Sequence, residues 1–381
     1  MNIEEPLRTV AAALAESGLQ APGAAPMRAG RWVVLFGGRQ RPLLMPAGDY
    51  ELQKRWLSFF VDGRLRSLYA MTVLKLNSLV PRAGLLPELR LPLARRAAVQ
   101  IGTPGPYRKA SALLVSQTGE ALALAKIALL ESADPMVAKE ARWLRRVAGI
   151  EKLADQVPRL LAEGSLAGGR RYLVTSLAPT TRASTEFTPA HARFLGALGR
   201  SDLQSMRFRD SPCCEYLERT LAAIEPSVTR GEAGQLRGAL LDCRLSLAHW
   251  VGPFVVSQGD FARWNVRKQR ESLFVFDWEY ARAGANPLSD VFHYHLVERA
   301  ASGRHVGARL MREVMRRARD IARELYPEWS WRDCEISALA LAYLLEVLLL
   351  YCRASGGLDR SDDVLRSYWL LLERRAAWLA A

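Results

Sequence analysis

Residues 254–266 read FVVSQGDFARWNV, and residues 273–279 read LFVFDWE. Each stretch contains an apolar run that predicts a short strand, with polar side chains directly after it. Asp260 follows the first run, Asn265 lies on the same tight loop, and Asp277 ends the second run. Phosphoryl transfer from ATP requires these residue types, because a carboxylate accepts the proton of the attacking hydroxyl and oxygen ligands hold magnesium on the phosphates. The pattern therefore predicts a phosphotransfer site.

A purely structural interpretation of these residues is also available. Asp260 and Asn265 are common turn formers, and Asp277 has the side chain of a helix N-cap. Each residue taken alone favours that interpretation. The three together, in this order and next to apolar strands, favour the functional one.

The segment resembles the catalytic and metal-binding loops of the aminoglycoside phosphotransferase/choline kinase family. That family typically shows His-Gly-Asp-x-x-x-x-Asn, then an apolar strand ending in Asp-Trp-Glu, then glycine, proline and aspartate. The matching residues here are Gln258-Gly259-Asp260, Asn265, Asp277-Trp278-Glu279, Gly284, Pro287 and Asp290. The resemblance implies that Asp260 is the catalytic base, that Asn265 and Asp277 are magnesium ligands, and that Asp290 braces the loop.

The resemblance extends with falling specificity over residues 97–370. Lys126 lies on an expected strand with no other charge, and Glu140 lies on the helix that follows. A kinase needs such a cation on the α- and β-phosphates and a carboxylate to hold the cation in place. An ordinary surface ion pair is the alternative, since the same helix carries several basic residues.

Two weaker nucleotide-binding features accompany this pair. The turn from Gly102 to Gly105 is placed to cover phosphates with backbone N–H groups, although it lacks the spacing of a glycine-rich phosphate loop and an ordinary hairpin turn explains it equally well. By analogy with the family, Ser176 and Leu177 lie where an interlobe hinge would bind adenine.

The strand and helix signals predict an α+β fold. The family resemblance implies that this fold is bilobal and protein-kinase-like, with nucleotide in the cleft. Residues 97–177 are expected to form a small lobe of five antiparallel strands and one helix. Residues 178–381 are expected to form a larger, mainly helical lobe. Residues 1–96 are expected to be an accessory region, with a helix at 6–17, two strands near 32–45 and a helix at 64–79.

The helix at residues 64–79 has basic and apolar residues, so it suits either a peripheral membrane contact or packing on the next domain, and we favour packing. The longest apolar run, at 338–352, is too short to span a membrane and predicts a core helix. No segment has the features of a secretory signal, and we expect a cytoplasmic protein.

The formal net charge of +14 is compatible with anionic partners, but no basic run alternates with aromatic residues, so we expect no nucleic-acid binding. Five cysteines without metal-ligand spacing indicate neither a zinc site nor a disulfide framework. His293 and His295 are expected to be half-buried helix residues rather than metal ligands.

One position departs from the family pattern: Gln258 replaces the family histidine. Because an amide both donates and accepts hydrogen bonds, we expect activity to survive with altered loop packing. The leading hypothesis is an ATP- and magnesium-dependent phosphotransferase that acts on a hydroxyl of a small molecule, such as a sugar, an aminoglycoside or an amino alcohol.

The alternative is a pseudokinase-like binding or scaffold protein without turnover. Protein kinase activity is disfavoured, because the interval from Asp277 to Asp290 is too short for an activation segment. The acceptor, the choice between ATP and GTP, and the oligomeric state are left open. The net positive charge of the chain weakly favours neutral or anionic acceptors over polycationic ones.

Overall fold

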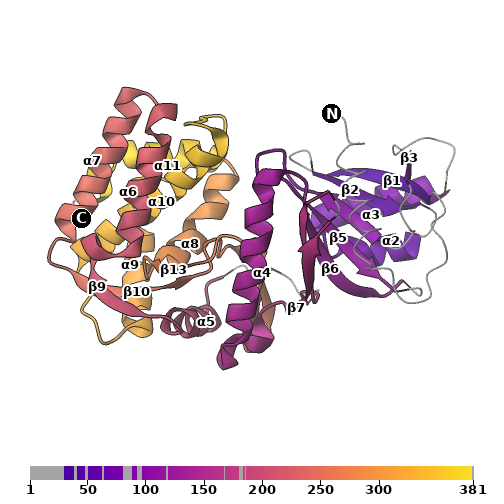
Figure 1. Cartoon of the computed structure of the whole chain (residues 1–381), viewed down its shortest axis with the longest axis horizontal. Helices are drawn as coiled ribbons and strands as arrows, with labels where there is room; N and C mark the ends of the chain where they lie inside the picture. Colours follow the sequence, from indigo (N-terminus) through magenta and orange to yellow (C-terminus); the bar gives the residue numbers. More distant parts are fainter. Residues whose placement is uncertain are drawn as a thin grey trace. The chain divides into compact units, whose positions relative to one another are not determined.

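The computed structural model describes residues 30–37, 41–47, 50–61, 64–79, 88–91, 97–116, 119–166, 168–179, 183–184 and 186–379. The helix expected at residues 6–17 lies outside these ranges. The chain forms two compact units (Figure 1). The first comprises Met1–Arg146 and Val157–Arg182, and the second comprises Val147–Gln156 and Ala183–Ala381.

The first unit is built on an eight-stranded sheet in which every pair of neighbours is antiparallel. In their order across the sheet, the strands are β3 (Glu88–Leu91), β1 (Gly30–Gly37), β2 (Arg41–Pro46), β4 (Ala97–Ile101), β5 (Lys109–Val115), β6 (Ala121–Ala128), β8 (Arg171–Thr175) and β7 (Leu160–Ser165). The five strands predicted between residues 97 and 176 are β4 to β8.

The α+β class is confirmed, and the sheet is larger than the predicted five strands. Strand β2 pairs with β4, with Leu44 opposite Val99, so the sheet continues into residues before 97. An edge strand leaves backbone groups unpaired. Because β1, β2 and β3 extend the sheet beyond β4, the edge of the sheet lies at β3 and not at β4. Whether residues 1–96 act as a separate accessory region stays a prediction.

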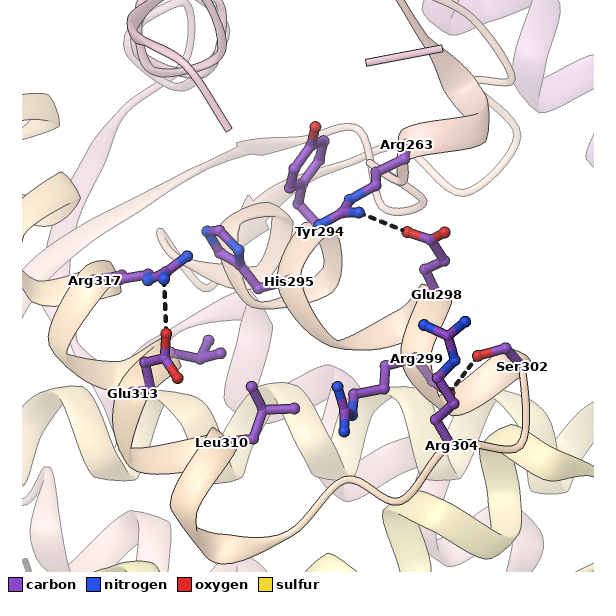
Figure 2. A pocket seen from close by; sticks show the side chains of 11 residues that line it. Arg263, Tyr294, His295, Glu298, Arg299, Ser302, Arg304, Leu310, Glu313 and Arg317 are labelled. Carbon is purple, nitrogen blue, oxygen red and sulfur yellow. Dashed lines mark hydrogen bonds and ion pairs between the residues drawn. The ribbon is translucent and has the colours of Figure 1, made fainter. Parts of the chain in front are cut away.

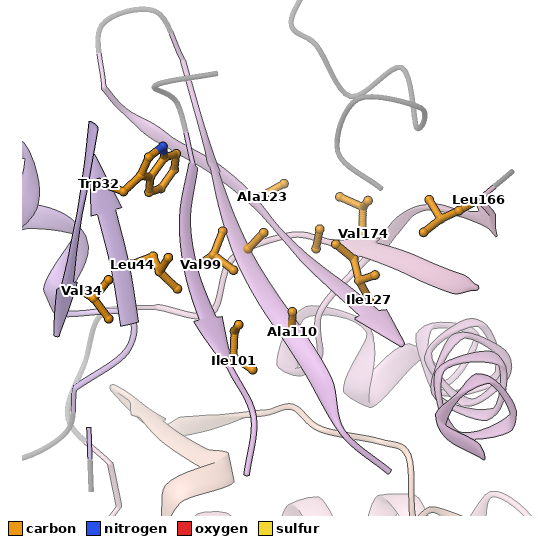
Figure 3. Packing of buried hydrophobic residues seen from close by; sticks show 12 residues of the cluster. Trp32, Val34, Leu44, Val99, Ile101, Ala110, Ala123, Ile127, Leu166 and Val174 are labelled. Carbon is orange, nitrogen blue, oxygen red and sulfur yellow. The ribbon is translucent and has the colours of Figure 1, made fainter. Parts of the chain in front are cut away.

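Alternate side chains of the strands form a buried apolar layer on one face of the sheet. This layer runs from Trp32 on β1 through Val99 and Ile127 to Leu166, after β7 (Figure 3). The period of two along each strand explains the alternation. The layer fixes the register of β6, and with it the face to which Lys126 projects.

Helices cover the opposite face of the sheet. Helices α2 (Tyr50–Leu57) and α3 (Arg64–Leu79) pack on it through residues such as Trp56 and Leu74. Helix α4 (Asp134–Ala148), which follows the short 3₁₀ helix η2 (Glu131–Ala133), packs through Val137 and Ala141 against β6 and β8. Of the two interpretations of the helix at 64–79, the structure shows packing, here on the sheet.

The second unit is mainly helical. Its α-helices are α5 (Pro189–Arg200), α6 (Pro212–Ile224), α7 (Arg230–Ser246), α8 (Ser289–Ala301), α9 (Ala308–Leu325), α10 (Asp333–Ser355), α11 (Asp363–Glu373) and α12 (Ala376–Leu379). Short 3₁₀ helices lie at η3 (Glu151–Gln156), η4 (Phe208–Asp210), η5 (Glu225–Ser227) and η6 (Arg263–Asn265).

Helix α10 is the core helix of this unit. It packs against α6, α7, α9 and α11 (Figure 1). By length and composition it is the one helix among the described residues that is apolar enough to cross a membrane, but 78% of its most apolar window is buried inside the unit. Its Glu346 pairs with Arg282, with 3.0 Å from Nε to Oε1, which satisfies the carboxylate that interrupts the apolar run.

Two small sheets interrupt the helices. Strand β10 (Val251–Ser257) lies between β9 (Gln204–Arg207) and β13 (Arg282–Ala285), and β11 (Val266–Gln269) forms a hairpin with β12 (Ser272–Val275). The loops that leave β10 and β12 carry the residues predicted to perform the chemistry.

Candidate active site

The loop that leaves β10 carries Asp260. Strand β10 is buried through Phe254, Val255 and Val256, and Ser257 is its last residue. Residues 258–262 come next and are followed by the 3₁₀ turn η6, which ends at Asn265. Residues 258–265 are called the catalytic loop below. Its start is fixed by the strand and its end by the hydrogen bond from Asn265 N to Ala262 O, at 2.9 Å.

Asp290, near the start of α8, braces the catalytic loop. Its Oδ2 accepts from Gln258 N at 2.7 Å, and its Oδ1 accepts from Gly259 N at 3.0 Å and from Ser257 Oγ at 2.9 Å. Burial raises the pKa of Asp290 above its ordinary value, and these three hydrogen bonds oppose the rise. The position of Asp290 agrees with the bracing role that the family resemblance implies.

Gln258 joins the catalytic loop to the loop that carries Asp277. Its Nε2 donates to the carbonyls of Phe276 at 3.2 Å and Asp277 at 2.6 Å. Its Oε1 accepts from Asp260 N at 2.9 Å. The amide thus donates and accepts at once, as predicted from the replacement of the family histidine.

Gly259 is required where the two loops approach each other. Its φ of +82° lies in the left-handed region, and a Cβ there would come within 2.4 Å of Tyr280 O. A side chain at this position would therefore be strained and would also push the loops apart.

Both oxygens of the Asp260 carboxylate are held by side chains. Oδ2 accepts from Asn265 Nδ2 at 2.7 Å, and the same nitrogen also donates to Asp260 O at 3.0 Å. Oδ1 lies 2.9 Å from His293 Nε2. The carboxylate is therefore fixed in one orientation, yet it retains lone pairs for a further proton donor.

The contact with His293 is a functional feature that the sequence interpretation missed. The other ring nitrogen of His293, Nδ1, lies 3.2 Å from Tyr343 Oη, which in turn lies 2.8 Å from Tyr368 Oη. Burial raises the pKa of both tyrosines, so the hydroxyls remain protonated donors. A usable signal was the spacing of Asp290 and His293, since residues three apart on a helix share one face.

Asp277 lies on a strained turn after β12. Its φ is +70°, which is uncommon for a residue other than glycine. Its carbonyl is held by Gln258, and the following Trp278 is fully buried with its Nε1 donating to Val275 O at 3.0 Å. Strain of this kind persists only where the surroundings enforce it, and it often marks a functional residue.

The residues that would hold magnesium are oxygen donors, as this hard cation requires. Asn265 uses its Nδ2 on Asp260, which leaves its Oδ1 as the atom available for a metal. Asp277 offers a carboxylate. The donor set therefore fits a magnesium ion bound together with substrate phosphates.

In the first unit, Lys126 and Glu140 form a close ion pair. Lys126 Nζ lies 2.6 Å from Glu140 Oε1, and the Lys126 and Glu140 side chains are 13% and 3% exposed. Leu173 lies opposite Lys126 on the neighbouring strand β8, and the apolar contacts of α4 hold the helix on this face of the sheet. Both side chains are too buried for this to be an ordinary surface ion pair. Exposed pairs are screened by solvent and weak, whereas a buried cation needs a partner of opposite charge.

The other two predicted nucleotide-binding features are less specific. Gly102 continues the β4–β5 ladder by donating to Lys109 O at 2.8 Å, and Gly105, with φ of +152°, has open space at its Cβ position. Ser176 N donates to Arg159 O at 2.9 Å, so this hinge N–H is already used, while Leu177 packs on the helix-covered face of the sheet. Their roles in nucleotide binding stay predictions.

A family model described as the phosphotransferase enzyme family matches residues 110–331, which is more than half of the 381 residues. The matched segment contains Lys126, Glu140 and the whole catalytic loop. The resemblance inferred from the sequence motifs is confirmed.

A solved structure supports the same fold. The chain is similar to a thermostable mutant of aminoglycoside phosphotransferase APH(4)-Ia in its apo form, with 16% identity, a TM-score of 0.50, and coverage of 74% of this chain and 94% of that one. A Thermobifida fusca protein assigned as a fructosamine-3-kinase gives 18% identity, a TM-score of 0.47, and coverage of 75% and 94%. No curated protein sequence matches the chain.

Proposed function

The chain belongs to the phosphotransferase enzyme family, and from that premise we propose that it transfers the γ-phosphoryl group of ATP to a hydroxyl of a small molecule, with Asp260 as the catalytic base. The observation that carries the proposal is the fixed carboxylate of Asp260. Its two oxygens are held by Asn265 and His293, at 2.7 and 2.9 Å.

The role of Asp260 follows from this geometry. A general base must be ionised, oriented and within hydrogen-bond reach of the proton that it accepts. Asn265 orients the carboxylate from one side and His293 from the other, while the side chain is still 23% exposed. An acceptor hydroxyl that reaches this open side would donate its proton to Asp260 as it attacks the phosphoryl group.

Asn265 and Asp277 are the proposed magnesium ligands. These two residues would hold the ion beside the phosphates of ATP, where its positive charge would offset the negative charge that develops during transfer. The protein's own contribution is to aim the two oxygen donors, through the Asn265–Asp260 hydrogen bond and the Gln258 bridge to Asp277 O. This pre-set orientation is the means by which a phosphotransferase lowers the barrier, because the chemistry depends mainly on positioning and electrostatics.

Lys126 and Glu140 are the proposed phosphate clamp. The ion pair with Glu140 holds the ammonium group of Lys126 in place. Such a cation would bind the α- and β-phosphates as a point charge. With the main-chain groups of Gly105 and Leu177, it would complete the nucleotide site; the N–H of Gly102, like that of Ser176, is already used within the sheet unit.

The first experiment is nucleotide binding by thermal shift, with ATP or GTP, in the presence and absence of magnesium. A ligand that binds the native state raises its melting temperature. We expect a magnesium-dependent shift with the wild type and none with Asp277→Ala. The matched control is Asp320→Ala, which removes an exposed carboxylate of α9 and should shift like the wild type.

A second assay measures ADP release with panels of sugars, amino alcohols and aminoglycosides as acceptors. Turnover that requires an acceptor hydroxyl would support the proposal. Magnesium-dependent nucleotide binding without release of ADP for any acceptor would instead favour a pseudokinase-like binding protein. Equal shifts for the wild type and Asp277→Ala would contradict the assigned metal ligand.

A further inference from the structure

A cavity in the helical unit is lined by several arginines. It has a volume of about 250 Å³ and lies against helices α8 and α9 and the catalytic-loop residue Arg263 (Figure 2). Four of its eleven lining residues are arginines, and two are glutamates. The charged lining residues are Arg263, Arg299, Arg304, Arg317, Glu298 and Glu313.

The positive charges of this pocket are only partly neutralised. Arg263 pairs with Glu298 at 3.1 Å, and Arg317 pairs with Glu313 at 2.7 Å. The other two arginines of the pocket, Arg299 and Arg304, have no carboxylate partner among the described residues. Arg299 Nε donates to His305 O at 2.9 Å, which orients its side chain without neutralising it.

Within the part of the chain that the structure describes, the Arg304 guanidinium has no hydrogen-bond or ion-pair partner. Two of the four guanidinium charges therefore have no carboxylate partner. The lining carries an excess of positive charge that an anionic ligand would neutralise.

His295 adds a polar atom that lacks a partner. It lies between Arg317 on one side and Arg263 and Tyr294 on the other (Figure 2). Among the described residues, its buried Nε2 has no hydrogen-bond partner. Burial, followed by the charges of Arg317 and Arg263 and opposed by Glu313, lowers the pKa of His295 to about 4. A neutral ring with an unpaired nitrogen costs free energy, and a ligand that bonds to it would recover that cost.

The pocket lies on a different face of α8 from the catalytic carboxylate. Successive residues of an α-helix are rotated by about 100° around its axis, so His295 lies nearly on the opposite side of α8 from His293. His293 contacts Asp260, whereas His295, Glu298 and Arg299 line the pocket. Only Arg263 belongs to both regions, since it follows Asp260 in the catalytic loop and its guanidinium lies 5.7 Å from the ring centre of Tyr294.

We propose that this pocket is a binding site for a small, multiply charged anion, namely a phosphate ester or a polycarboxylate, separate from the phosphotransfer site. Arginine suits such ligands, because its planar group donates paired hydrogen bonds to phosphate or carboxylate oxygens. The volume is below the ~300–1,000 Å³ that is common for drug-sized ligands, which favours a compact anion.

The test is a calorimetric titration of the full chain with inorganic phosphate, pyrophosphate and citrate at constant ionic strength, with chloride as the reference salt. The variants are Arg304→Gln and Arg317→Gln. The matched control is Arg323→Gln, which removes an exposed arginine of the same helix as Arg317 but outside the pocket. We expect affinity for at least one of the three anions to fall about tenfold or more in both pocket variants and to stay unchanged in the control.

Two further measurements distinguish this site from the nucleotide site. Asp277→Ala should retain anion binding even though we expect it to lose magnesium-dependent nucleotide binding. In the wild type, the bound anion should also raise the pKa of His295, followed by NMR of its ring carbons. The proposal is overturned if the wild type binds none of the three anions, if both pocket variants bind like the wild type, or if Asp277→Ala abolishes binding.

Discussion

The catalytic loop and the glycine turn at residues 102–105 are both predicted to meet phosphate groups, yet they are held in different ways. Side chains of buried residues brace the catalytic loop: Asp290 binds its backbone N–H groups, and Gln258 ties it to the Asp277 turn. The glycine turn is held mainly by backbone carbonyls: Gly102 N donates to Lys109 O, and Arg108 donates to Gly105 O and, through Nε, to Gly102 O at 3.2 Å. An exposed hydrogen bond from Arg41 to Thr103 Oγ1, at 2.6 Å, is its other side-chain support.

This difference shows which of the two loops is held rigidly. Buried, fully bonded polar groups are rigid, because breaking one leaves an unsatisfied group in a low dielectric. Groups that must be aligned to within a fraction of an ångström for chemistry benefit from that rigidity. A turn that only covers phosphates does not need it, and an exposed turn can adjust to its ligand.

The largest effect is expected from Asp260→Asn. The variant keeps the size of the side chain but cannot accept the proton of the acceptor. We expect kcat to fall by roughly 10²–10⁴, the range for loss of a general base. Nucleotide affinity should change little. Steady-state kinetics with an acceptor from the screen, together with calorimetry for ATP, measures both quantities, and full turnover would remove Asp260 from its role.

Gly259→Ala tests the rigidity of the catalytic loop. The added methyl group meets Tyr280 O at 2.4 Å in a left-handed backbone. We expect the free energy of unfolding to fall by about 2–4 kcal/mol, the sum of backbone strain and overpacking. Urea denaturation measures the change. A loss below about 1 kcal/mol would show that the loop is not rigid.

Acid should weaken the helical unit through buried histidines. Burial lowers the pKa of His191 from 6.5 to about 4; the hydrogen bond with Thr188 opposes this shift, and the charges of His295 and Lys268 add to it. Its neutral form is favoured in the folded state, so its contribution is complete above pH 6.5 and is lost as the pH falls towards 4. One such group changes the stability by about 1.4 kcal/mol per pH unit in this window.

The variant His191→Phe isolates that contribution. Phenylalanine retains the packing against Phe187 and Phe261 but loses the acceptor for Thr188 N, so a constant loss of about 1 kcal/mol is expected at pH 8. Between pH 6.5 and 4, stability should fall less steeply than in the wild type. Parallel curves for the two proteins would contradict the role of His191.

His293→Gln tests the second support of Asp260. Glutamine can donate a hydrogen bond, but it cannot reproduce the ring that connects Asp260 to Tyr343. We expect kcat to fall about tenfold with KM for ATP nearly unchanged, because the base is misaligned while the nucleotide contacts remain. Tyr368→Phe, which removes only the end of this chain of hydrogen bonds, is the milder comparison. An unchanged kcat for His293→Gln would show that Asn265 alone orients the base.

Local sequence motifs indicated which loops carry Asp260, Asn265 and Asp277, because these residues are close in sequence. They belong to two loops joined by one hairpin, and Gln258 links the two loops through the Asp277 carbonyl. His293 and Tyr343 were not predictable in this way. Their contacts with the loop depend on the packing of α8 and α10, which no short pattern encodes.

The sheet shows the same limit. Strands β4 to β6 follow one another with readable turns, and β7 and β8 follow α4 with a turn between them; the existence of all five was predicted. The pairing of β2 with β4 joins strands that are separated in the chain by α2, α3 and β3. The apolar runs of β1 and β2 indicated two strands without indicating that β2 pairs with β4. Long-range pairing is set by burial of the shared apolar layers rather than by local propensity.

The smallest effect is expected from Gly105→Ala, the counterpart of Gly259→Ala in the other loop. Its φ of +152° also favours glycine, but a Cβ there meets no atom within 4 Å. We expect only the backbone cost, about 1 kcal/mol or less, in urea denaturation. If the turn does cover phosphates, the same variant should raise KM for ATP a few-fold while kcat stays unchanged, because a stiffer turn reaches the phosphates less well. A stability loss equal to that of Gly259→Ala would mean that the two loops are equally rigid, and the contrast between them would fail.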